Sequence, residues 1–340
     1  MKTQKHFLPV AMIAGLMFTT TAGFSQGLLT PPGAPAATMK SLAQIEPRTP
    51  ISSAPFTISS PGSYYLTTNL TGAANQNGIS ISSGDVTLDL NGFTLSGVAS
   101  AGPYYSGILI ANTYTNIVVR NGTVTGWTNF GVDGYTRGFP RNVIYEHLTL
   151  SANGYVGLDA EATSIIRDCL SQNNGSEGFF SVGSLITDCI ARDNGSYGFD
   201  ITDSSMRSCV SHFNWTGVSA DHSTVADCDI MNNSTNGLTV GSACHIINNR
   251  IADNKNTFYG NGITINGSRN YIGNNAILNN NFALVGSGSA ATNNFVVQNK
   301  FIGNSGSVIS GNNIFPITEL PASAGGSFTN ANAWVNVFFP

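Results

Sequence analysis

Glycine followed by an apolar residue recurs along this chain at intervals of 19 to 29 residues. Apolar and polar side chains then alternate over the next four positions, which is the pattern of a short β-strand with one buried face. The repeated pairs are Gly78-Ile79, Gly107-Ile108, Gly131-Val132, Gly157-Leu158, Gly178-Phe179, Gly198-Phe199, Gly217-Val218, Gly237-Leu238 and Gly262-Ile263.

A second series of residues keeps step with these glycines. In the middle of the chain each member precedes its glycine by 8 to 10 residues, and Asn249 precedes Gly262 by 13. The series is Asn121, His147, Cys169, Cys189, Cys209, Cys228, Asn249 and Asn275. Two marks at a nearly constant phase indicate that one structural unit is repeated.

Each unit is predicted to contain two short strands and two turns. One strand is expected over 186–190 and the next over 198–202, joined by polar residues at 192–195. A period near 20 residues with strands this short predicts one coil of a parallel β-solenoid, an all-β fold made from a single chain. Propeller blades need about 40 residues, and membrane β-barrels need strands of about 9–11 residues.

The phase of the glycines also predicts which side chains face inward. Counting from each glycine, positions +1 and +3 should build the core, and positions +2 and +4 should face solvent. The predicted core pairs are Ile79/Ile81, Ile108/Ile110, Leu158/Ala160, Phe199/Ile201, Leu238/Val240 and Ile263/Ile265.

Four of the five cysteines fall at the same phase of successive units. Neighbouring strands lie about 4.8 Å apart, whereas a disulfide prefers Cβ atoms about 3.8 Å apart. A column of buried free thiols is therefore expected, with one or two disulfide bridges as the alternative. Sequons such as Asn174-Gly175-Ser176 are interpreted as corners that place Asn or Gly at left-handed backbone angles.

The two ends differ from the repeats. Residues 1–25 read as a signal peptide, with Lys2 and Lys5 before an apolar core too short to span a bilayer. Residues 26–55 are predicted to be a Pro-rich linker with a capping helix over 38–46, followed by the solenoid over 56–315 and a C-terminal cap over 316–340. A secreted or periplasmic location is expected.

Composition narrows the partners. Only 9% of the residues are charged and the formal net charge is −4. Mild acidity disfavours binding to nucleic acid or to an anionic membrane. No later segment is long and apolar enough to predict a membrane span.

The repeat units resemble those of the right-handed parallel β-helix superfamily, the pectin-lyase-like fold. The resemblance covers residues 56–310, and the leader-proximal segment is similar to exported β-helix proteins of environmental Gram-negative bacteria. It implies the fold and a polysaccharide as partner, and the enzyme signatures of polygalacturonases and pectate lyases are missing. The units that carry it are DCLSQNNGSEGF, DCIARDNGSYGF, DCDIMNNSTNGL and VTLDLNGFTLSG.

The outward positions suggest one candidate site. Asp133, Asp159 and Glu161 should lie on neighbouring coils, beside a loop with extra residues at 134–141. Clustered carboxylates can bind Ca²⁺, support β-elimination with a nearby arginine, or catalyse glycoside hydrolysis. The alternative is an ordinary solvated face. The loop contributes Tyr135, Arg137, Phe139 and Arg141.

Further candidates are less specific. Asp200 continues the outward carboxylate column, and Asp221-His222 forms a separate acid–imidazole pair. Aromatic residues in two long insertions could stack on sugar rings or pack against the coil; they are Tyr104, Tyr105, Phe258 and Tyr259. Two functions remain open: a β-helix that binds polysaccharide along its outer face without catalysis, and a lyase or hydrolase acting on acidic glycans.

Overall fold

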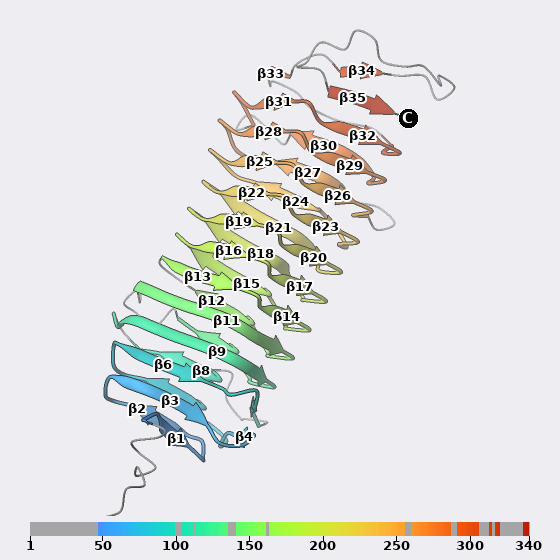
Figure 1. The fold of residues 1–340 in the computed structure, drawn as a ribbon. Coiled ribbons are helices and arrows are strands. Elements are labelled where there is room, and N and C mark those ends of the chain that lie inside the picture. The colour runs from blue at the N-terminus through green and yellow to red at the C-terminus, as the bar shows by residue number, and fades with distance from the viewer. Residues whose placement is uncertain are drawn as a thin grey trace, which may run out of the picture. The chain divides into compact units, whose positions relative to one another are not determined.

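The computed structural model describes residues 47–98, 104–111, 113–134, 141–160, 163–255, 260–286 and 291–305, and the backbone of three later strands. The chain divides into Met1–Glu46 and Pro47–Pro340. The predicted signal peptide and capping helix lie outside the described residues. The second unit is a parallel β-solenoid whose described residues contain strands and no helix (Figure 1).

One sheet of 11 parallel strands forms what we call the third face of the solenoid. Each strand pairs with its equivalents in the coils before and after it. These strands are β2 (Phe56–Ile58), β5 (Ile79–Ile81), β8 (Ile108–Ile110), β10 (Val132–Asp133), β12 (Leu158–Ala160), β15 (Phe179–Val182), β18 (Tyr197–Thr202), β21 (Thr216–Asp221), β24 (Leu238–Val240), β27 (Asn261–Ile265) and β30 (Phe282–Gly286).

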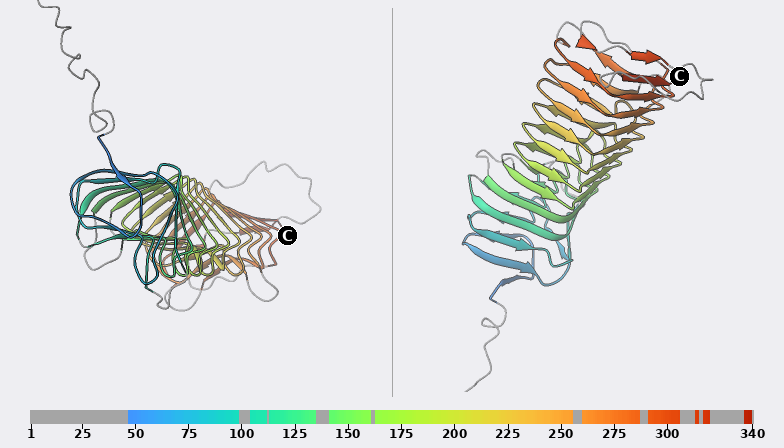
Figure 2. Two further views of the ribbon diagram at one scale, coloured as in Figure 1. Left: turned by 90° about the horizontal axis from the view of Figure 1, so that it is seen from below. Right: turned by 45° about the horizontal axis from the view of Figure 1, so that its top comes forward.

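The other 24 strands line two further faces, and the coils overlie one another along the stack (Figure 2). The first face holds β1 (Thr49–Ile51), β3 (Gly62–Leu66), β6 (Val86–Asp89), β13 (Ser164–Arg167), β16 (Leu185–Thr187), β19 (Ser205–Arg207), β22 (Thr224–Ala226), β25 (His245–Ile247), β28 (Tyr271–Gly273), β31 (Phe295–Val297) and β33 (Asn313–Ile314). The second face holds β4 (Leu70–Thr71), β7 (Thr94–Ser96), β14 (Leu170–Gln172), β17 (Ile190–Arg192), β20 (Val210–His212), β23 (Asp229–Met231), β26 (Arg250–Ala252), β29 (Ala276–Leu278), β32 (Lys300–Ile302), β34 (Ile317–Glu319) and β35 (Asn336–Phe339). Two long strands run through both faces: β9 (Thr115–Thr125) and β11 (Arg141–Ser151).

Each regular coil therefore contains three strands, where the sequence pattern predicted two. The strand expected over 186–190 bends at Asp188, whose φ is 54°, so β16 and β17 lie on different faces. Aspartate and asparagine adopt this left-handed conformation more readily than other side chains. The bend needs only one residue, and the alternating pattern does not reveal it.

The predicted core is confirmed. Every residue predicted at positions +1 and +3 is at most 1% exposed. Equivalent side chains also stack from coil to coil, as Phe179 and Phe199 do with ring centroids 4.9 Å apart and planes 9° apart. The interior is thus a set of columns parallel to the stack.

The corner between the second and third faces holds a column of buried asparagines. Asn194 Oδ1 accepts hydrogen bonds from the backbone N (3.1 Å) and Nδ2 (2.9 Å) of Asn174, and Asn194 Nδ2 donates to the carbonyl oxygen of Ser171 (3.2 Å). The left-handed residue here is Asn173, with φ 55°, so the interpretation of Asn174 as a left-handed corner was wrong. The column comprises Asn153, Asn174, Asn194, Asn214, Asn233, Asn254, Asn280 and Asn304.

This column explains the glycine series. A Cβ atom on Gly178 would lie 2.8 Å from Asn194 Nδ2 and 2.6 Å from the carbonyl oxygen of Gly198. A Cβ on Gly198 would likewise lie 2.6 Å from Asn214 Nδ2. Glycine is required at these positions because the neighbouring coil and the asparagine amide occupy the space that a side chain would need.

All five cysteines are free and buried, which confirms the expected thiol column. The column continues into asparagine, since Cys228 N donates to Asn249 Oδ1 at 2.9 Å. Its N-terminal end was predicted one residue out of register: Leu148 pairs with Gly122, and His147 occupies the adjacent left-handed position with φ 53°.

The N-terminal coils use different contacts. On the first face, Arg120 lies 3.3 Å from Asp89 and 3.8 Å from Glu146, which also binds Arg167, so charges alternate along successive strands. Trp127 is 3% exposed and heads the asparagine column, because its backbone N donates to Asn153 Oδ1 at 3.2 Å.

The ends of the solenoid extend beyond the repeats. β1 begins at Thr49, inside the segment predicted as linker, and pairs with β3. β35 pairs with β32 and with β34, so part of the segment 316–340 continues the second face. Within the described residues, no helix has the length and apolar character needed to cross a membrane.

Candidate functional site

A pocket of about 470 Å³ opens on the outer side of the third face, over β12, β15 and β18. Two aromatic rings form one wall, where Phe130 and Tyr155 meet edge to face at 5.4 Å and 77°. Carboxylates and a further ring complete the lining, which comprises Phe130, Tyr155, Val156, Asp159, Glu177, Phe180 and Asp200. Aromatic rings and a few polar groups are the usual composition of a small-molecule site.

Strand register fixes the order of the groups along the pocket. Asp159 pairs with Phe180, which pairs with Asp200. The two aspartates are therefore about 10 Å apart along the stack, at two strand spacings. Phe180 lies between them and is partly exposed.

Asp133 and Asp159 face each other on neighbouring strands, as predicted from their shared phase. They are only 6% and 5% exposed, so the expectation that they are solvated must be corrected. Asp133 Oδ2 accepts a hydrogen bond from Ser106 Oγ at 3.3 Å. Asp159 contributes to the pocket lining and Asp133 does not.

The carboxylates give the pocket a negative potential. Burial raises the pKa of Asp200, a hydrogen bond from Ser219 lowers it, and the charge of Glu177 raises it further. Burial raises the pKa of Tyr197 too, and the charges of Asp200 and Glu177 act in the same direction. Behind the sheet, the fully buried Tyr145 has a raised pKa from burial and from the charges of Asp159 and Asp133.

The structure brings together only part of the predicted site. Asp159 and Asp200 share the pocket. Arg141 is exposed at the start of β11, Tyr104 is 79% exposed and Tyr105 is partly buried, and none of the three lines the pocket. The other predicted residues lie outside the described part of the chain: Tyr135, Arg137, Phe139, Glu161, Phe258 and Tyr259.

Calcium binding by Asp133, Asp159 and Glu161 stays a prediction, because Glu161 is not among the described residues. Within those residues, no group of three or more His, Cys, Asp and Glu side chains is arranged to hold a metal ion. The fit of Ca²⁺ to this part of the molecule therefore has no support from the described side chains.

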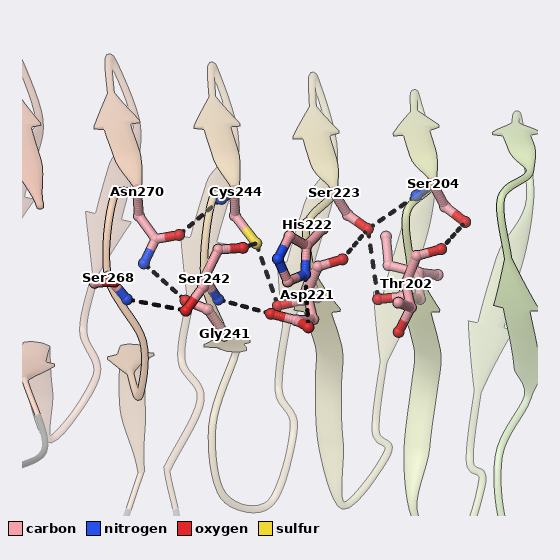
Figure 3. Close-up of polar contacts among 12 residues, drawn as sticks. Thr202, Ser204, Asp221, His222, Ser223, Gly241, Ser242, Cys244, Ser268 and Asn270 are labelled. Carbon is pink, nitrogen blue, oxygen red and sulfur yellow. Dashed lines mark hydrogen bonds and ion pairs between the residues drawn. The ribbon is translucent and has the colours of Figure 1, made fainter. Parts of the chain in front are cut away.

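The Asp221-His222 pair forms a separate polar cluster at the C-terminal edge of β21 (Figure 3). Asp221 Oδ2 lies 2.8 Å from His222 Nδ1, and Asp221 Oδ1 accepts a hydrogen bond from the backbone N of Ser242 at 2.7 Å. Ser223 Oγ donates to the carbonyl oxygen of Asp221 at 2.6 Å. The carboxylate thus fixes the corner of the next coil, which accounts for the pair structurally.

Sequence reasoning missed Phe130, Tyr155 and Glu177. A signal was available: Phe130 and Glu177 directly precede the ladder glycines Gly131 and Gly178. The pocket lies between this −1 column and the +2 column that contains Asp159, Phe180 and Asp200. Only positions after the glycines were assigned to faces, so the other wall was not considered.

Comparison with known proteins identifies the architecture. No protein-family model matches the chain, and no curated protein matches it in sequence. The A-module of the mannuronan C-5 epimerase AlgE4 from Azotobacter vinelandii is similar in structure, with a TM-score of 0.61 and 14% identity over 79% of this chain and 89% of the module.

Two further structures are similar at the same level. A variant of the periplasmic alginate epimerase AlgG has a TM-score of 0.57 and 13% identity, covering 86% of this chain and 77% of that protein. The Dettilon tailspike protein has a TM-score of 0.58 and 13% identity, covering 85% of this chain and 61% of the tailspike. These likenesses show the right-handed parallel β-helix fold and leave the activity to be argued from the site.

Proposed function

We propose that this protein binds a polysaccharide chain in the pocket on the third face. The pocket itself carries the proposal, because its exposed rings can stack on sugar rings while Asp159, Glu177 and Asp200 accept hydrogen bonds from hydroxyl groups. The long parallel sheet continues on both sides of the pocket and offers a track for a linear polymer (Figure 1). Two neighbours are named as epimerases of mannuronan and alginate, which are polysaccharides.

An extracytoplasmic location is part of this proposal. It is supported by the basic start and apolar core of residues 1–25, and by a structural neighbour whose name describes it as periplasmic. In that setting the partner would be an extracellular or cell-surface glycan.

Binding is tested on a panel of immobilised glycans with the native protein and Phe180→Ala. Loss of the central ring should weaken binding of the retained glycan by about tenfold. Phe282→Ala is the matched control, since Phe282 is 38% exposed on the same face at the distant strand β30. Absence of any retained glycan, or an equal loss in both variants, would contradict the proposal.

Glycoside hydrolysis is a second candidate, favoured by the raised pKa of Asp200. A general acid must stay protonated near neutral pH, and inverting enzymes separate their carboxyl groups by about 6.5–9.5 Å. Asp159 would then be the base. The same incubations, scored for new reducing ends, separate binding from hydrolysis, and Asp200→Asn should abolish any product formation. A lyase reaction would need the predicted Arg137, which lies outside the described residues.

A further inference from the structure

The charged groups that line the pocket are all acidic. Asp159 comes from β12, Glu177 from the corner before β15, and Asp200 from β18. No lysine, arginine or histidine is among the described residues that line it. Three strands in succession therefore present one carboxyl group each to the same cavity.

The rings and the carboxylates are interleaved. Phe180 lies between Asp159 and Asp200 in the strand register, and the Phe130–Tyr155 wall stands beside them. A sugar ring stacked on Phe180 would have its equatorial substituents directed toward carboxylates on either side. The cavity thus selects for the charge of those substituents as well as for the shape of the ring.

The pocket carboxylates already repel one another. The charge of Glu177 raises the pKa of Asp200, and both charges raise the pKa of Tyr197. A uronate carboxylate 4 Å from one of them would add a repulsion of about 4 kcal/mol at an effective dielectric constant of 20. An ammonium group at the same distance would be attracted by as much, and it donates charge-assisted hydrogen bonds.

We propose that the polysaccharide bound in this pocket is a cationic amino glycan, a polymer of 2-amino-2-deoxyhexose with free amino groups. This inference rests on the proposed function and specifies its ligand class. It departs from the acidic glycans expected from the sequence, because that expectation depended on loop arginines and a bound Ca²⁺, whereas the described lining is anionic.

Three β-1,4-linked tetrasaccharides that differ mainly at C2 test the class: the tetramers of glucosamine, N-acetylglucosamine and glucose. Calorimetry at pH 6 and low salt should show the glucosamine tetramer binding at least about tenfold more tightly than the glucose tetramer. The preference should shrink in 0.5 M NaCl because salt screens partly exposed charges. An oligomannuronate is included as the anionic probe.

Two variants locate the selectivity. Asp200→Asn should remove most of the preference for glucosamine and leave glucose-tetramer affinity within about twofold. Asp188→Asn is the matched control, since Asp188 is an exposed carboxylate at a left-handed corner that asparagine also accepts, and it should keep the preference intact.

The outcomes separate the two levels of the proposal. Equal affinity for the glucose and glucosamine tetramers, or tighter binding of oligomannuronate, would overturn the ligand class while leaving polysaccharide binding in place. Failure of all four probes, together with an empty glycan panel, would overturn polysaccharide binding itself. An unchanged preference in Asp200→Asn would remove the pocket from the explanation.

Discussion

The coils before Ala160 and the coils after it share strand geometry but differ in what joins one coil to the next. After Ala160 the corners carry columns of buried asparagine, serine and cysteine that bond to the neighbouring backbone. Before it, Leu148 and Trp127 take the equivalent inward positions, and the exposed first face carries the ion pairs around Arg120. One region is held by buried hydrogen bonds and the other by apolar packing and surface charge.

The pocket lies where these two regions meet. Phe130, Tyr155 and Asp159 belong to the first region, and Glu177, Phe180 and Asp200 belong to the second. The spacing of the ladder glycines falls from 26 to 21 residues at this point. A change in coil length leaves a step on an otherwise even surface, and large side chains from both regions line it.

The largest difference between the regions should appear when a buried asparagine is removed. Asn194→Ala leaves the backbone N of Asn174 and the carbonyl oxygen of Ser171 without their partner. At about 1–3 kcal/mol for each unsatisfied group, we expect a loss of at least about 3 kcal/mol in the free energy of unfolding. Urea denaturation followed by circular dichroism measures it.

Arg120→Met is the companion variant in the first region. It removes two ion pairs of a side chain that is 37% exposed, so we expect a loss of about 1 kcal/mol that shrinks in 0.5 M NaCl. If the two variants lose the same stability and respond alike to salt, the distinction between the regions fails.

A smaller effect should separate two kinds of glycine. Gly198→Ala places a Cβ 2.6 Å from Asn214 Nδ2 and 2.7 Å from the carbonyl oxygen of Gly217, and we expect a cost of about 2–3 kcal/mol from overpacking. Gly92→Ala has open space around its Cβ and a φ of +80°, so only backbone strain of about 1 kcal/mol is expected. Thermal unfolding of both proteins compares them, and a larger cost for Gly92→Ala would contradict the steric explanation.

The smallest effect concerns the pocket at the junction. Because the folded-state pKa of Asp200 is raised, its contribution to stability is present below the unfolded-state pKa of about 3.9 and is lost as pH rises through the folded-state value. Asp200→Asn should therefore stabilise the protein at pH 7, by less than about 1 kcal/mol, and hardly at pH 3. Equal shifts of the melting temperature at both pH values would show that the carboxyl group carries no such penalty.

Much of the fold could be predicted from the sequence because the solenoid is built from local repeats. The alternation after each glycine identified the core positions, and the phase of Cys169 to Cys228 identified their column. The third strand of each coil was missed because a single left-handed residue such as Asp188 divides an unbroken β-like run. His147 was misplaced because strand register, which depends on neighbouring coils, is not visible in spacing alone.

The candidate site was harder to predict. Asp159 and Asp200 were found because they repeat at one phase, whereas Phe130 and Glu177 sit on the other side of the glycines and come from different coils. Burial was also misjudged: alternation assigns a side chain to the outer face, but neighbouring side chains decide whether water reaches it, as Asp133 shows.

The interlocking of glycine and asparagine makes each regular coil interchangeable with its neighbours. Asn174 and Asn194 are 20 residues apart and make the same contacts, so a duplicated segment of that length would meet on both sides the surfaces it was built to fit. The gene for such a molecule can lengthen or shorten by whole units without redesign of the interior. Growth on the C-terminal side would leave the junction and its pocket untouched, so the reach of the scaffold and the identity of its ligand can evolve separately.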